Sequence, residues 1–234
     1  MSQNPPPFPP PTPAKKGLST GCVVGIVLGA LAVLAIPVIA VLAGIAVPVI
    51  GGVQMRAKIT AASAQAHAIH IGIMMYSSDH NGEFPTGDRD ANEALRKLIP
   101  KYVEDERPFY VAGSAWHNAA PEKKPDNDLG SPPTYAKALE TGENHWAYVS
   151  GLTDKSPFDV PLLADGFSDE IGSYTHRPAE PGGVWRGKKA IVTFADGTVK
   201  SLAPTSGTLR VEVNGKDLFS PENLPKGTKV LNPK

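Results

Sequence analysis

The chain has 234 residues, a balanced charge with 23 basic and 23 acidic residues, and a single cysteine, Cys22. The charge is unevenly spread, since residues 1–58 hold four basic residues and no acidic one, which leaves the remainder with a net charge of −4. A mildly acidic domain is poorly suited to neutralising phosphates, so we expect no nucleic-acid partner. Without a cysteine, the same region can form no disulfide and no cysteine-ligated zinc site.

Residues 1–20 contain the proline-rich segment PPPFPPPTP. Proline lacks the backbone donor that helices and sheets need, so we expect a disordered tail that samples polyproline II. Such a segment serves either as a spacer or as a ligand of an SH3-like domain, and we favour the spacer.

An uncharged apolar run of 32 residues follows Gly21 and predicts a transmembrane helix over residues 21–53. As one helix the run would reach about 48 Å, well beyond the hydrocarbon core of a bilayer. We therefore expect the helix to tilt or to pass from the lipid into a soluble domain, with kinks at Pro37 and Pro48. Three alternatives to a single membrane-spanning helix are less favoured. A cleaved signal peptide has a shorter apolar core, and a lipoprotein signal places its cysteine after the apolar stretch. In a hairpin bent at Pro37, each half would be too short to span the membrane, so both ends would stay on one side.

Basic residues flank the run on both sides, so the positive-inside rule is nearly balanced. The short, acid-free tail decides the orientation, because such a tail is more naturally retained on the cytoplasmic side. We therefore predict a single-pass protein of the inner (cell) membrane with a cytoplasmic N-terminus and a periplasmic or otherwise extracytoplasmic domain. Gly21, Gly25 and Gly29 form a ladder that would let a second helix approach closely. The competing explanation, which we favour, is that glycine is simply common in membrane helices.

Residues 54–78 predict an amphipathic helix that continues the membrane helix as one spine. Its apolar residues recur at alternating spacings of three and four: Ile59, Ala62, Ala66, Ile69, Ile73 and Tyr76. The segment SSDHNGEFP supplies the stop signals.

Residues 79–234 predict a soluble α+β domain. Asp196-Gly197 and Asn214-Gly215, each between extended runs, are strong hairpin signals. We expect a short helix at Ala91–Leu98, loops at about 118–133, and strands at Trp146–Ser150, Val160–Leu163, Ala190–Phe194, Thr198–Leu202 and Leu209–Val213.

Several segments follow one another in a recognisable order: GIAVP, MMYSSDHNGEFP, NEALRKLIPKYVEDERPFYVAGS, WAYVSGL, PLLADG and TFADGTVKSL. Over roughly residues 40–203 the chain resembles the type II secretion pseudopilin-like (type IV pilin-like) proteins of the Verrucomicrobia–Planctomycetes type. The resemblance implies a pilin-like fold, in which a long N-terminal helix packs on a small antiparallel β-sheet. It also implies that the apolar half of the helix lies in lipid or in a filament, with the domain displayed outside.

The chain departs from this family at the processing site. Family members carry a glycine followed by Phe-Thr-Leu-Ile-Glu, which prepilin peptidase reads, whereas Gly17 is followed here by LSTGC. Cys22 thus stands in place of the glutamate that neutralises a neighbour's N-terminal amine during filament assembly. We expect an unprocessed, membrane-retained relative of the pseudopilins.

The resemblance implies a membrane-anchored structural or assembly component of a secretion or pilus-type surface apparatus. Its partners would be membrane lipid and other pilin-like subunits or copies of itself, bound through the apolar helix. The alternatives are a membrane-tethered binding module and, less favoured, a tethered hydrolase. No GxSxG, P-loop or GxGxxG motif is present, so we expect neither enzymatic activity nor an organic cofactor.

Among possible ligands, calcium has the best-supported candidate binding residues. Major pseudopilins bind this ion in a loop between late strands, and Asp165, Asp169 and Glu170 offer hard oxygen donors in the corresponding region. Asp196 is a further donor, although turn chemistry alone explains it, and we favour such structural roles over metal binding. His67 and His70 have a spacing able to share a metal, but a solvated polar face is the favoured interpretation.

Overall fold

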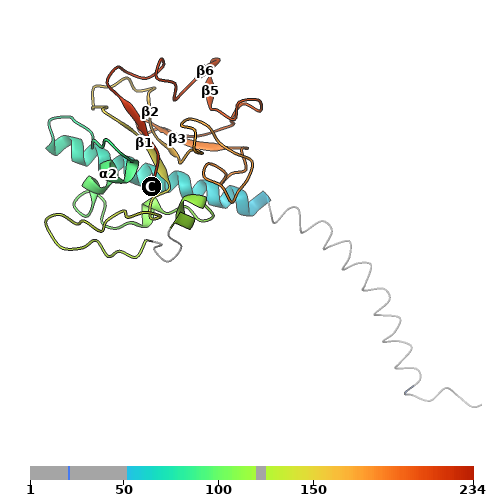
Figure 1. The fold of residues 1–234 in the computed structure, drawn as a ribbon, viewed down its shortest axis with the longest axis horizontal. Coiled ribbons are helices and arrows are strands. Elements are labelled where there is room, and N and C mark those ends of the chain that lie inside the picture. Colours follow the sequence, from blue (N-terminus) through green and yellow to red (C-terminus); the bar gives the residue numbers. More distant parts are fainter. Residues whose placement is uncertain (1–20, 22–51, 120–124) are drawn as a thin grey trace, which may run out of the picture. The chain divides into compact units, whose positions relative to one another are not determined.

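The computed structural model describes residue 21, residues 52–119 and residues 125–234 (Figure 1). The proline-rich tail and residues 22–51 of the apolar run, with Gly25, Gly29 and the two prolines of its predicted kinks, lie outside the described residues. Within the described ranges, no helix is both long enough and apolar enough to cross a membrane. Val53–Lys234 form one compact unit.

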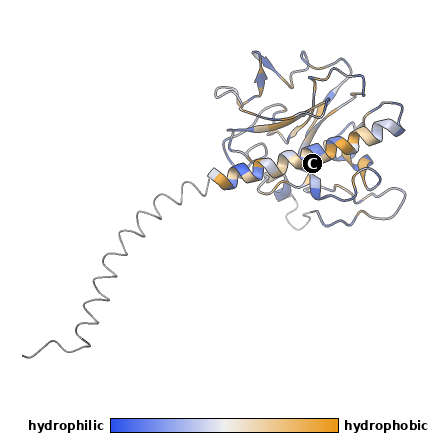
Figure 2. Ribbon diagram, turned by 180° about the vertical axis from the view of Figure 1, so that it is seen from behind, coloured by the Kyte–Doolittle hydropathy of each residue, from blue (hydrophilic) through white to orange (hydrophobic). Residues whose placement is uncertain are grey.

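A long helix occupies residues 52–79, as the apolar spacing predicts (Figure 2). Ala62, Ala66, Ile69 and Ile73 have at most 1% of their surface exposed and join the main hydrophobic core. Burial of one stripe provides most of the stability of a helix in a folded protein, because intrinsic propensity alone is weak. The predicted amphipathic helix is therefore confirmed over its described length.

The helix packs with a five-stranded antiparallel sheet whose order is β4-β3-β2-β1-β7. These strands are β1 (Trp146–Ser150), β2 (Pro161–Asp165), β3 (Ala190–Phe194), β4 (Val199–Leu202) and β7 (Lys229–Leu231). Every residue of β1, β2 and β3 is buried, so both faces of the central sheet are covered. This explains why their sequences are mainly apolar and lack a regular polar alternation. The predicted α+β class is confirmed.

Both predicted hairpins are present. Asp196-Gly197 turns β3 into β4, with Oδ1 of Asp196 accepting from the Thr198 amide at 2.8 Å. Asn214 and Gly215 have φ values of 55° and 76° and connect β5 (Glu212–Val213) to β6 (Lys216–Asp217). Positive φ at both central residues is the requirement of the type I′ turn.

One strand prediction needs correction, and one strand was not predicted. The strand expected at Leu209–Val213 is mostly wrong, because Leu209 has a φ of 54°, in the left-handed region, and breaks the extended backbone. Only the last two residues of that range form β5. β7, a three-residue strand near the C-terminus, was not predicted; it pairs with β1 through Tyr148 and Leu231.

The predicted short helix is present in two parts, α2 (Ala91–Leu95) and a 3-10 turn at Arg96–Leu98. Asp90 caps α2 by accepting from the amide of Glu93. Two more 3-10 turns, Arg107–Phe109 and Ala115–Ala119, lie in the connection to β1. Glu106 and Ser114, which belong to the two buried polar clusters described next, directly precede these turns.

Candidate functional site

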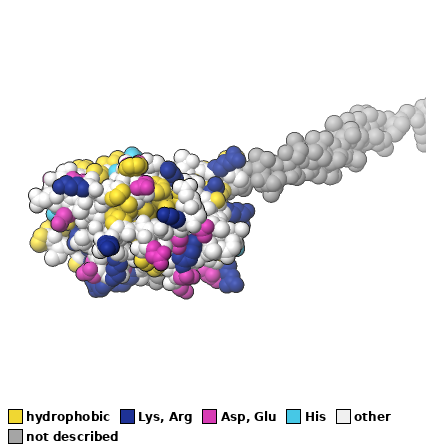
Figure 3. All heavy atoms as spheres, turned by 90° about the horizontal axis from the view of Figure 1, so that it is seen from above, with side chains coloured by type: hydrophobic (Ala, Val, Ile, Leu, Met, Phe, Trp, Pro, Cys, Tyr) yellow, Lys and Arg dark blue, Asp and Glu magenta, His cyan; other side chains and the backbone are white. Residues whose placement is uncertain are grey.

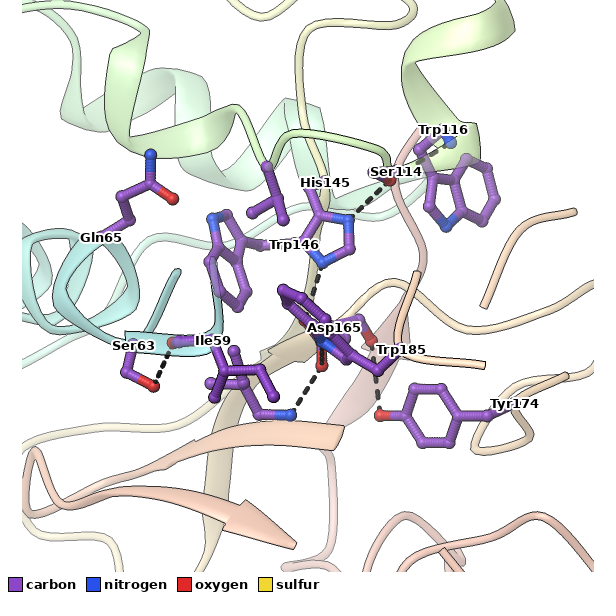
Figure 4. Close-up of polar contacts among 12 residues, drawn as sticks. Ile59, Ser63, Gln65, Ser114, Trp116, His145, Trp146, Asp165, Tyr174 and Trp185 are labelled. Atoms are coloured by element: carbon purple, nitrogen blue, oxygen red, sulfur yellow. Dashed lines mark hydrogen bonds and ion pairs between the residues drawn. The ribbon is translucent and has the colours of Figure 1, made fainter. Parts of the chain in front are cut away.

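Asp165, the first of the predicted calcium donors, lies at the end of β2 and is fully buried. Its Oδ1 is 2.7 Å from Nε2 of His145, and its Oδ2 accepts from Nε1 of Trp185 at 2.7 Å and from the Ile191 amide at 2.6 Å (Figure 4). Three donors from three different segments thus converge on one carboxylate. Such an arrangement compensates the charge of a buried carboxylate, which would otherwise be very costly.

The network continues through the second ring nitrogen of His145, which lies 2.7 Å from the hydroxyl of Ser114. Ser114, His145 and Asp165 therefore form a hydrogen-bonded chain of the residue types used in nucleophilic catalysis. Their exposed fractions are 4%, 1% and 0%, so a substrate has no access to the serine in this conformation. We call Ser114, His145, Asp165 and Trp185 the Asp165 cluster, and we interpret it as a structural element of the core.

The other two predicted calcium donors do not share this environment. Asp169 and Glu170 are exposed in the turn after β2, and Glu170 forms an ion pair with Arg210. The structure therefore gives Asp165 different partners from those of its two neighbours in sequence. Asp196 hydrogen-bonds to Thr198 within its own turn, as turn chemistry predicts. Calcium binding by these residues stays a prediction.

A different group of carboxylates comes together among the described residues. Ligand atoms of Glu106, Asp126 and Glu143 all lie within 4.8 Å of one another, and we call these three residues the Glu143 cluster. Glu106 and Glu143 are buried, whereas Asp126 is exposed. Hard oxygen donors of this kind suit a divalent cation such as calcium. Sequence reasoning missed the group because its members lie on loops far apart in the chain.

The buried carboxylates of the Glu143 cluster also organise the surrounding loops. Oε1 of Glu106 accepts from the Leu139 amide at 2.7 Å, and Oε2 accepts from the Asn127 amide at 3.2 Å. Glu143 accepts from the amide of Glu140. Burial, and then the nearby charge of Glu106, raise the pKa of Glu143 to about 7, and burial also raises the pKa of Glu106.

The two histidines of the long helix have separate surroundings. His67 is exposed, as expected for a solvated face, but that expectation is wrong for His70, which is 7% exposed. Nε2 of His70 lies 3.2 Å from the carbonyl oxygen of Ala195, so it joins the helix to the β3–β4 turn. Burial lowers the pKa of His70, although this hydrogen bond partly opposes the effect.

An apolar cleft of about 870 Å³ lies between the β3–β4 hairpin and the β5–β6 hairpin. Its apolar lining includes Phe194, Leu202 and Leu218, and the exposed Phe158 stands at its edge with 72% of its surface accessible. Figure 3 shows apolar side chains gathered on one face and surrounded by charged ones. A concave apolar surface with a polar rim is the usual form of a ligand site.

Comparison of the chain with models of protein families, with curated proteins and with solved structures gives no match in any of the three.

Proposed function

We propose that the protein is a membrane-anchored, pseudopilin-like component of a secretion or pilus-type surface apparatus. The observation that carries this proposal is the long helix at residues 52–79, which follows directly on the uncharged run in the sequence and is built into the domain core. The proposal places residues 21–53 in the inner membrane and the domain on the extracytoplasmic side.

Anchoring through this helix would couple the membrane segment firmly to the domain. Ala66, Ile69 and Ile73 are completely buried, so the helix cannot leave the domain without exposing a large part of the core. A flexible linker would transmit neither position nor force, whereas a core helix transmits both. This property suits a structural subunit, and a helix packed on an antiparallel sheet supports the pilin-like arrangement.

Membrane fractionation of cells that express the full chain tests this proposal. We expect the protein to stay in the pellet after a carbonate wash, and we expect the domain to be digested by protease added to the outside of spheroplasts. The double variant Leu31→Lys, Leu34→Lys should release it, since each lysine costs about 3 kcal/mol at the centre of a membrane helix. Full release of the native chain by carbonate would refute the proposal.

The cleft favours a second candidate, a membrane-tethered binding module. The fluorescent probe 1-anilinonaphthalene-8-sulfonate should then bind to the cleft. Leu202→Glu should weaken this binding, because it places a charge in the lining. Ser201→Glu is the matched control, because Ser201 is exposed and lies outside the lining. Equal probe fluorescence in the two variants would contradict this candidate.

A further inference from the structure

The long helix carries a second apolar stripe on its solvent-facing side. Its members are all exposed and follow alternating spacings of four and three from residue 57 onward: Val53, Ala57, Ala61, Ala64, Ala68, Ile71 and Met75. Val53, Ile71 and Met75 rank among the large hydrophobic residues most exposed in the described chain, at 59%, 48% and 50%. We call these seven residues the outer stripe.

The outer stripe is more than a scatter of exposed apolar residues, which is common on protein surfaces. Ile71 and Met75 are one helical turn apart, so their side chains adjoin, and the stripe as a whole extends for about 33 Å. The alternating spacing of three and four is the heptad pattern of helices that supercoil in pairs. The four alanines leave the backbone accessible to close approach by another helix.

The surroundings of the stripe fit a helical partner. The residues beside it include Lys58, Thr60 and His67, all exposed, so polar side chains border the apolar seam. The opposite stripe, with Ala62, Ala66, Ile69 and Ile73, is already covered by the domain core. The outer stripe is thus the face of this helix that a further element can cover without disturbing the fold.

We propose that the outer stripe pairs with the outer stripe of a second copy, in a parallel and in-register helix dimer. This inference rests on the proposed function, because it uses the membrane anchor to choose the partner. Residues 22–51 carry no charge and precede the helix directly. Copies anchored through that run enter the helix from the same side of the membrane and at the same depth, which makes their helices parallel and in register.

Anchoring also makes a modest interface sufficient. One exposed stripe of mainly alanine buries less area than a typical stable complex between soluble proteins. Confinement to a membrane raises the effective concentration of the copies, and this can increase the apparent affinity by about 10²-fold or more. Pairing with equal register distinguishes this dimer from a filament in which neighbouring copies are displaced along the axis.

Cysteine crosslinking of the full chain in native membranes tests the dimer. In a Cys22→Ser background, Ala64→Cys and Ala68→Cys should each form a disulfide-linked dimer about tenfold faster than Arg56→Cys, an exposed position off the stripe. Adding Ile71→Glu should reduce the crosslinking at position 64, and Ile71→Leu should preserve it. Because Ile71 is half-exposed, both changes should leave the melting temperature unchanged.

Two outcomes would overturn the inference. The first is an equal rate of crosslinking at Arg56→Cys and at the stripe positions. The second is that co-expressed Ala57→Cys and Ile71→Cys chains crosslink to each other faster than two Ala64→Cys chains do, which would indicate staggered helices. The carbonate wash separates this failure from that of the proposed function. A chain retained in membranes but not crosslinked through the stripe refutes only the dimer, whereas a released chain refutes the anchor itself.

Discussion

The two buried acidic clusters of the domain handle negative charge in opposite ways. Around Asp165, Trp185 and the Ile191 amide donate to the carboxylate, and Nε2 of His145 lies 2.7 Å from it. In the Glu143 cluster, two buried carboxyl groups and the exposed Asp126 face one another. Each buried carboxyl group there accepts from a backbone amide, Glu106 from that of Leu139 and Glu143 from that of Glu140.

This difference has a direct thermodynamic consequence. Removing a buried carboxylate leaves the groups that hydrogen-bond to it without a partner. A carboxyl group beside another acid is most stable when it holds its proton, so its cluster weakens as pH rises. We therefore expect the loss of the Asp165 carboxylate to lower the free energy of unfolding, and the neutralisation of Glu143 to raise it.

The largest expected effect is that of Asp165→Ala. This change leaves His145, Trp185 and the Ile191 amide without their shared acceptor in the core, so we expect the free energy of unfolding to fall by about 3–5 kcal/mol. Urea unfolding of the full chain in detergent micelles, followed by circular dichroism, measures it. A loss below about 1 kcal/mol would show that the cluster contributes little.

Glu143→Gln should have the next largest effect, and it should depend on pH. The pKa of Glu143 is raised from 4.5 to about 7, so the folded state binds its proton more tightly than the unfolded state does. The resulting stability is complete below pH 4.5 and is lost as pH rises to about 7. The variant should thus match the native chain at low pH and exceed its stability by up to about 3 kcal/mol at pH 8.

The buried His70 also makes the stability of both chains depend on pH. Its pKa is lowered, so its protonation at acidic pH destabilises the folded state, which is the opposite slope with pH. Because both chains contain His70, subtracting their stabilities at each pH isolates the contribution of Glu143. A difference that does not change between pH 4.5 and pH 8 would contradict the assigned pKa.

Trp185→Phe should have a smaller effect than Asp165→Ala. The carboxylate keeps His145 and the Ile191 amide as donors, while the indole hydrogen bond to Oδ2 is lost. We expect a loss of about 2 kcal/mol in the free energy of unfolding, the usual value for a hydrogen bond to a charged group. If Trp185→Phe proved as damaging as Asp165→Ala, the indole and not the carboxylate would be the centre of the cluster.

Asp169→Ala should have the smallest effect, below about 0.5 kcal/mol, because Asp169 is exposed. The same variant tests the calcium prediction. If Asp165, Asp169 and Glu170 bind calcium, adding the ion should raise the melting temperature of the native chain and not that of the variant. Equal melting temperatures in calcium and in a chelator would remove these residues as a calcium site.

The sequence predicts those structural features that depend on residues close to one another along the chain. The buried stripe of the long helix follows from the spacing of Ala62, Ala66 and Ile69, because helical periodicity fixes which residues share a face. Asn214-Gly215 gives a hairpin because both residues accept positive φ. In contrast, β7 is too short to carry a pattern of its own and becomes a strand only because β1 offers an edge.

By itself, then, the sequence determined the α+β class, the long helix, the turns and the uncharged run that predicts a membrane anchor. Only the tertiary structure decided the environment of each acidic residue. Asp165 and Asp169 are four positions apart, yet one is sealed among donors and the other faces water. Glu106 and Glu143 meet because two loops fold together. Charge, burial and proton affinity depend on neighbours in space, and those neighbours come from distant parts of the chain.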